Sequence, residues 1–153
     1  MCKRVISTVV TADRNWCDMN ELFTALLSWA VVLSGYPAPA VPPEVAFVSH
    51  QELTNMACNG TECKVVGFHP PGSNRVYIDD RLHPEESIFA TSIIVHEFVH
   101  YLQQSGGKFA LKYSCDDALE MEREAYYVQS RFLEAHGVYW VVGSAMHFSS
   151  CDP

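Results

Sequence analysis

Basic residues are scarce in this 153-residue chain, which has 10 Lys and Arg against 18 Asp and Glu and a formal net charge of −8. Nucleic acids and anionic membrane surfaces bind through clusters of positive charge, so neither is expected as a partner. A membrane span is also not expected, because the most apolar run, residues 22–33, falls short of the ~20 residues that a spanning helix needs. The acidic balance weakly favours neutral or basic peptide partners.

Signatures of several other chemistries are missing as well. The chain has no C-x-x-C pair, which argues against a zinc knuckle or a thioredoxin-like centre. No Gly-rich phosphate loop or Ser-His-Asp order stands out, so nucleotide chemistry and serine acyl transfer are not predicted. Ser7, Thr8 and Thr11 interrupt the apolar run after Met1, which is not typical of a signal peptide. If the protein is exported, we expect this sequence to be a mature form with an added methionine.

Six cysteines are present, an even number spread along the chain. Free thiols in a cytosolic protein are one interpretation, but we favour disulfides in an oxidising compartment, which predicts a secreted or periplasmic protein. The pair predicted to be bonded is Cys58 and Cys63, because Asn59-Gly60 between them is a turn-forming dipeptide.

The length and the composition, 48% hydrophobic and 18% charged, predict a single globular domain over residues 1–153. Asp18 and Glu21 form a capping-box pattern that predicts a core helix from Asp18 to Gly35; an interfacial helix is the alternative. A proline-rich connector follows. We expect a strand at 45–48, a short helix capped by Ser49 and Glu52, and a hairpin formed by 64–70 and 75–80.

The segment VHEFVHYL carries the pattern H-E-x-x-H at His96, Glu97 and His100. Residues four apart lie on one face of a helix, so the two imidazoles can bind one zinc ion while Glu97 reaches a water molecule. The helix is predicted to begin near Pro84, to end at Gly106-Gly107 and to be buried, because most of its circumference is apolar. The alternative is an ordinary buried helix with two histidines four residues apart.

A zinc ion held by two histidines needs a third protein ligand. The segment from Asp116 to Gly137 predicts a helix, and at 100° per residue Glu122 falls at the centre of its inward face. Glu120 and Glu124 lie about 160° away and are predicted to face solvent, although either could replace Glu122. Alternatively, Glu122 points into a wet crevice or pairs with an arginine.

Together these residues resemble the zincin metallopeptidases, in particular the gluzincin branch, in which E-x-E-A often supplies the third ligand as EREA does at 122–125. The resemblance covers residues 75–133. It implies an α+β fold in which a small mixed sheet with an edge hairpin packs on the metal helix, and in which 75–79 is the edge that pairs with substrate. Tyr126 departs from the family, which often has an aspartate there to orient a ligand histidine.

The function implied by the resemblance is hydrolysis of a peptide or protein substrate by a zinc-activated water, with His96, His100 and Glu122 as ligands and Glu97 as general base. Hydrolysis of another amide is also possible. The rival hypothesis is a catalytically inactive, disulfide-stapled binding module. The tail, VYWVVGSAMHFSSC, is expected to pack as a strand or lid tied by Cys151. Candidates for oxyanion stabilisation are Tyr113, Tyr126, Tyr127, His136 and His147.

Overall fold

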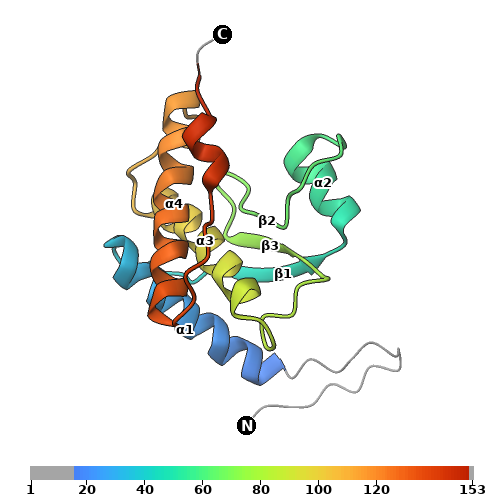
Figure 1. The fold of residues 1–153 in the computed structure, drawn as a ribbon, viewed down its shortest axis with the longest axis vertical. Coiled ribbons are helices and arrows are strands. Elements are labelled where there is room, and N and C mark those ends of the chain that lie inside the picture. The colour runs from blue at the N-terminus through green and yellow to red at the C-terminus, as the bar shows by residue number, and fades with distance from the viewer. Residues whose placement is uncertain (1–15, 152–153) are drawn as a thin grey trace.

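The computed structural model describes residues 16–151 and shows a mixed α+β fold, as the sequence predicts. Figure 1 shows four helices, a three-stranded sheet and a short 3-10 helix in these residues. Their bounds are α1 Trp16–Ser34, β1 Glu44–Val48, α2 His50–Cys58, β2 Gly67–Phe68, β3 Arg75–Asp79, α3 Ile88–Ser105, α4 Cys115–Ala135 and η1 Ser144–Phe148. No helix in the described part is long and apolar enough to cross a membrane.

The sheet has the strand order β1-β3-β2. β1 pairs parallel to β3, and β2 pairs antiparallel to β3 with Phe68 opposite Tyr77, which confirms the hairpin. The prediction that 75–79 forms an edge is wrong. The α2 connection returns the chain so that β3 uses its backbone groups on both sides, and the edges are β1 and the two-residue β2.

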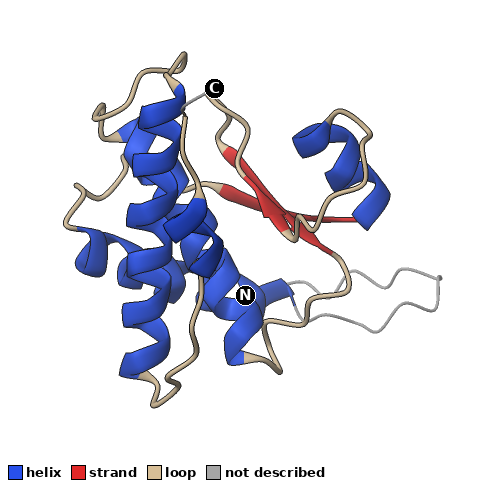
Figure 2. Cartoon of the chain, turned by 45° about the horizontal axis from the view of Figure 1, so that its top comes forward, coloured by secondary structure: helices blue, strands red, loops and turns tan. Residues whose placement is uncertain are grey.

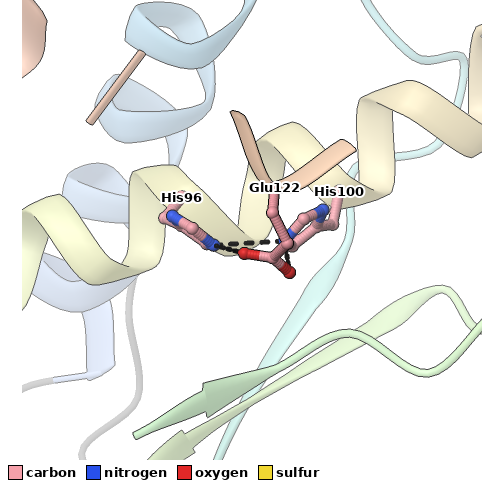
Figure 3. A group of neighbouring side chains, drawn as sticks. All are labelled: His96, His100 and Glu122. Atoms are coloured by element: carbon pink, nitrogen blue, oxygen red, sulfur yellow. Dashed lines mark hydrogen bonds and ion pairs between the residues drawn. The ribbon is translucent and has the colours of Figure 1, made fainter. Parts of the chain in front are cut away.

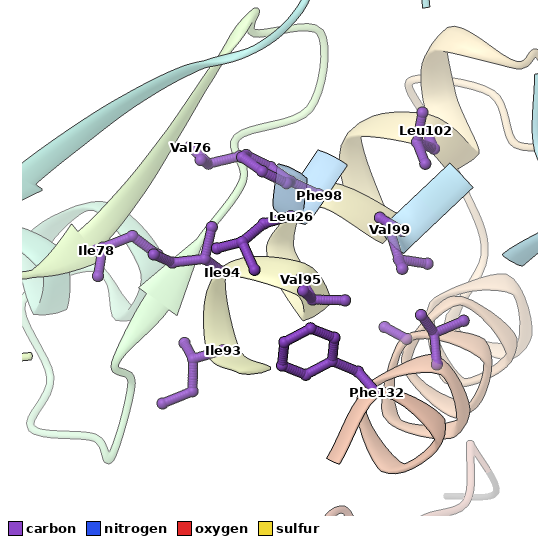
Figure 4. Packing of buried hydrophobic residues seen from close by; sticks show 13 residues of the cluster. Leu26, Val76, Ile78, Ile93, Ile94, Val95, Phe98, Val99, Leu102 and Phe132 are labelled. Carbon is purple, nitrogen blue, oxygen red and sulfur yellow. The ribbon is translucent and has the colours of Figure 1, made fainter. Parts of the chain in front are cut away.

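Helix α3 lies between the sheet and the other two long helices, and every residue from Ala90 to Gln103 is buried. Figure 2 shows α1, α3 and α4 gathered on one side of the sheet, whereas α2 lies apart. In Figure 4, Ile94 and Phe98 of α3 point toward Val76 and Ile78 of β3, and Phe132 of α4 lies on the other side. The predicted burial of this helix is confirmed, and its polar residues therefore lie inside the domain.

The helix starts were predicted less well than the helix ends. The Ser49–Glu52 capping box is present at α2, and α3 ends at Gly106 as predicted. α3, however, begins at Ile88 and not near Pro84, because the side chain of Ser87 accepts a hydrogen bond from the N–H of Ala90. Asp18 is not an N-cap, because α1 already begins at Trp16; an acidic residue suits any position in a first turn, so the pattern did not fix the boundary.

Two disulfides occur in the described residues, which is consistent with an oxidising compartment. The Cys58–Cys63 bond confirms the predicted pairing. The second bond joins Cys115, the first residue of α4, to Cys151. It ties down residues 138–151, which we call the C-terminal strap and which fold back along α4 in Figure 1. For this tail we predicted a strand or a lid tied by Cys151: the tie is confirmed, and the strand is wrong, because the strap consists of irregular backbone followed by η1.

Candidate metal centre

Three potential metal ligands converge from two helices (Figure 3). His96 and His100 lie one turn apart on α3, with their Nε2 atoms 3.1 Å from each other. Glu122 on α4 places one carboxylate oxygen 3.3 Å from Nε2 of His96 and the other 3.1 Å from Nε2 of His100. Glu122, predicted from the sequence as the third metal ligand, thus lies beside the histidine pair. Its side chain is 39% exposed, so the centre opens to solvent on the α4 side.

The hydrogen bonds of Gln103 determine which ring nitrogen of His100 carries a proton. The Nε2 amide group of Gln103 donates to the carbonyl of Met121 at 2.9 Å and to Glu124 at 3.1 Å, and both partners can only accept. Its Oε1 atom therefore faces His100, 2.9 Å from Nδ1. Because an amide oxygen only accepts, Nδ1 of His100 is the donor, and in the neutral ring Nε2 keeps its lone pair.

Gln129 fixes His96 in the same way. The hydroxyl of Ser92 donates to the carbonyl of Phe89 at 2.7 Å and accepts from the amide nitrogen of Gln129 at 3.0 Å. The amide oxygen of Gln129 then accepts from Nδ1 of His96 at 3.1 Å. Two buried amides thus orient both imidazoles, the role that an aspartate often takes in the family resembled and that Tyr126 cannot fill in the same manner. The sequence alone indicates no role for either glutamine.

This hydrogen-bonding pattern fits a metal. With both Nδ1 atoms donating, the two Nε2 atoms and a carboxylate face one another, and a positive charge between them, either a metal ion or a proton on an imidazole, satisfies these groups. Two nitrogens and one oxygen form a ligand set typical of a catalytic zinc site, with a further position left for water or substrate. Negative charge at the centre also acts on His100: burial lowers its pKa, but the hydrogen bond from His100 to Glu122 and the charge of Glu97 together raise it to about 9, so a proton competes with a metal at this nitrogen.

The carboxylate of Glu122 also stays charged. Burial opposes ionisation, but the hydrogen bonds with His100 and His96 and the positive charge of both rings keep its pKa well below the ordinary value. A proton can thus occupy the place of a cation between these groups, and metal binding would release it.

Glu97 is buried beside the centre. Burial raises its pKa, and the nearby charges of His96 and His100 act in the opposite direction. Its carboxylate accepts a hydrogen bond from the backbone N–H of His69. Gly67 makes room for it: a Cβ atom at Gly67 would lie 2.6 Å from Oε1 of Glu97, closer than real contacts allow. Both α3, which carries Glu97, and the β-hairpin, which packs against its carboxylate, therefore fix the position of this acid.

Two cavities meet at Gly67, Glu97 and Glu122. The smaller, of about 140 Å³, also contacts Phe68, His69, His100, Gln104, Tyr113, Ala118 and Met121. The larger, of about 450 Å³, is lined in addition by Lys64, Val65, Val66, Phe89, Ile93, His96, Tyr126, Gln129, Val141, Val142 and Gly143. A molecule that crosses from one cavity to the other therefore passes directly over the two acids.

The other two acids on α4 do not join the centre. Glu120 is exposed and lies 3.8 Å from the amino group of Lys108. The prediction that Glu124 faces solvent is wrong, since it is half-buried: it accepts from the hydroxyl of Tyr36 at 2.5 Å, from Gln103, and from Lys108. Glu124 therefore holds Gln103, which in turn contacts His100, and Tyr36 in the connection after α1 completes this network.

The candidates for oxyanion stabilisation separate by position. Tyr113 lines the smaller cavity, and the ring of Tyr126 packs on His96 with ring centroids 4.5 Å apart. Tyr127 and His147 are exposed and line neither cavity, and His136 bonds to the carbonyl of Phe132.

Sequence reasoning missed His69, a buried residue that lines the smaller cavity and donates its backbone N–H to Glu97. Its position directly after a short strand carried no signal of this contact.

The family to which the chain belongs is shown by one comparison. A family model described as a domain of unknown function, DUF6647, matches residues 15–150, so the chain is a member of that family. No curated protein and no solved structure matches the chain. The family match spans α1 through η1 and thus includes all three residues of the centre.

Proposed function

We propose that this protein is a zinc-dependent peptidase of the gluzincin type, with a zinc ion held by His96, His100 and Glu122 and with Glu97 as general base. The observation that carries the proposal is the convergence of Glu122 with two imidazoles whose orientation is fixed by Gln129 and Gln103. A buried histidine pair with no metal role would not need both Nε2 atoms directed at the same carboxylate.

The residues of the centre have two proposed roles, metal binding and proton transfer. Zinc, when bound, supplies Lewis acidity that lowers the pKa of a water molecule and polarises a carbonyl group. Glu97 lines both cavities and can accept a proton at its carboxylate and return it to a leaving amine. The N–H of His69 holds that carboxylate in place. Substrate backbone would run beside the β2 edge strand, which lines both cavities and has its outer side open for strand addition.

The two disulfides in the described part of the chain fit a protein that is exported to an oxidising compartment. In such a setting a peptidase acts on peptides or proteins outside the reducing cytosol. The acidic composition agrees with neutral or basic peptides as substrates.

The decisive experiment combines metal analysis with the Glu97→Gln variant. Purified protein should contain close to one zinc per chain and should cleave members of a quenched fluorescent peptide library. Glu97→Gln should retain the zinc and lose at least ~100-fold in kcat, in line with the loss of a general base. Full activity in Glu97→Gln would refute the mechanism. Zinc without cleavage of any library member would favour the rival hypothesis, a binding module that does no chemistry.

A further inference from the structure

The C-terminal strap forms one wall of the larger cavity. Val141, Val142 and Gly143 line that cavity together with His96, Glu97 and Glu122. The strap is held at three points. The ring of Trp140 packs on Phe89 with ring centroids 5.6 Å apart, Gly143 lies so close to Tyr126 that a Cβ would be 2.4 Å from its ring, and Cys151 is bonded to Cys115. The strap is therefore a fixed structural part of the site.

The wall is apolar and open to solvent. Val141 is 85% exposed and Trp140 is 55% exposed although both are large hydrophobic residues, and Phe89 and Val66 at the same cavity are partly exposed as well. Clustered apolar surface at the mouth of a cavity is typical of a binding site, because covering it removes that surface from water. A cavity of about 450 Å³ has room for a large side chain.

The charges at the cavity narrow the choice of ligand. Glu97 and Glu122 line it, and Lys64 is the only Lys or Arg that lines it in the described residues. An acidic side chain bound there would approach the two carboxylates and be repelled, whereas an aliphatic or aromatic one would contact Val141, Val142 and Phe89 without that cost. Because the acids are shared with the smaller cavity, whatever fills the larger one lies directly next to the reacting centre.

We infer that the strap is the specificity-determining wall of the substrate cleft and that it selects peptides with a large aliphatic or aromatic side chain next to the cleaved bond. The cleavage in this inference rests on the proposed function, whereas the selection of the side chain is a property of binding. Val141 and Val142 supply the apolar lining, while the contact of Trp140 with Phe89 and the Cys115–Cys151 bond hold the strap in place.

The experiment uses zinc-loaded full-length protein and peptide sets that differ only in one residue, which is Leu, Phe, Asn or Glu. The test variant is Val141→Asp, and the control is Val32→Asp on α1, which is 75% exposed and lines neither cavity. We expect Val141→Asp to lower kcat/KM for the Leu and Phe peptides about tenfold relative to the Asn peptide. Val32→Asp should leave this ratio unchanged. The paired variant Cys115→Ser/Cys151→Ser should reduce the same preference by freeing the strap.

Binding to the Glu97→Gln variant separates the two proposals. Cleavage without any preference for Leu or Phe, or a preference that Val141→Asp leaves intact, would overturn the role of the strap and leave the peptidase standing. No cleavage, but tighter binding of Leu and Phe peptides to Glu97→Gln that is lost on adding Val141→Asp, would support the strap and overturn the peptidase. If the protein showed no cleavage and no selective binding, both proposals would be overturned.

Discussion

The amide oxygen of Gln129 lies 3.1 Å from Nδ1 of His96, so a neutral group orients this ring. We expect Gln129→Leu to weaken zinc binding about 10- to 100-fold, because the ring loses its acceptor and can turn or change tautomer. Gln129→Glu keeps an acceptor at that place and should retain most of the affinity. Competition with a chromophoric zinc chelator measures both. Equal affinity of Gln129→Leu and the unchanged protein would show that Gln129 does not position His96.

Substitutions at Glu122 and Glu120, two glutamates on the same helix, form a matched test and control for metal binding. Glu122→Gln should lower zinc affinity by at least ~100-fold, since it replaces the charged ligand by a weak neutral one. Glu120→Gln should leave it within a factor of two, because Glu120 is exposed and contacts only Lys108 among the groups described. Zinc content after dialysis reports the difference. A larger loss in Glu120→Gln than in Glu122→Gln would contradict the assigned ligand set.

Gly67 tests the position of the proposed base. In Gly67→Ala the new methyl group would lie 2.6 Å from Oε1 of Glu97, so either the carboxylate or β2 must move. A displacement of ~1 Å in a catalytic group can cost 10²-fold, and we expect kcat/KM to fall 10- to 100-fold with the zinc content unchanged. Steady-state kinetics with metal analysis on the same sample would reveal this. A fully active Gly67→Ala would mean that the contact does not position Glu97.

The pH dependence of stability should reflect Asp79. The hydrogen bonds from the Arg81 guanidinium lower the pKa of Asp79 to about 2 despite burial, and His50 contributes a further hydrogen bond. A carboxylate with a lowered folded-state pKa stabilises the fold above its unfolded pKa of ~3.9, and this contribution disappears as the pH falls toward 2.

Asp79→Asn should therefore destabilise the protein by roughly 1–2 kcal/mol at pH 7 and by much less near pH 2. Urea unfolding at several pH values measures this, with Glu21→Gln on the exposed side of α1 as the control. A destabilisation that stayed constant across the range would exclude ionisation of Asp79 as its source.

Local signals predicted much of the fold. The Ser49 capping box, the turn between Cys58 and Cys63, and the glycines after α3 depend on neighbouring residues, and all were found where predicted. The start of α3 was misplaced because Pro84 and Ser87 are both acceptable at a helix start, and only the hydrogen bond to Ala90 distinguishes them.

Errors concentrated where distant segments meet. Strand order depends on how α2 returns the chain, so β3 was placed at an edge when it lies in the centre. The inward face of Glu122 followed from helical angle alone, whereas the partners of Gln103 and Gln129 come from contacts between α3 and α4. The same holds for Glu124, whose exposure was misjudged because Tyr36 and Lys108 reach it from other segments.

The burial of α3 bears on how this centre could be altered in the laboratory. Since every position from Ala90 to Gln103 is enclosed, a change of side-chain volume anywhere along these turns disturbs close packing as well as chemistry. Redesign of selectivity therefore has its tolerant positions on the strap, whereas exposed residues of α4 such as Arg123 and Tyr127 tolerate change but line neither cavity. Libraries that diversify those two segments and leave α3 untouched should yield the largest share of folded variants.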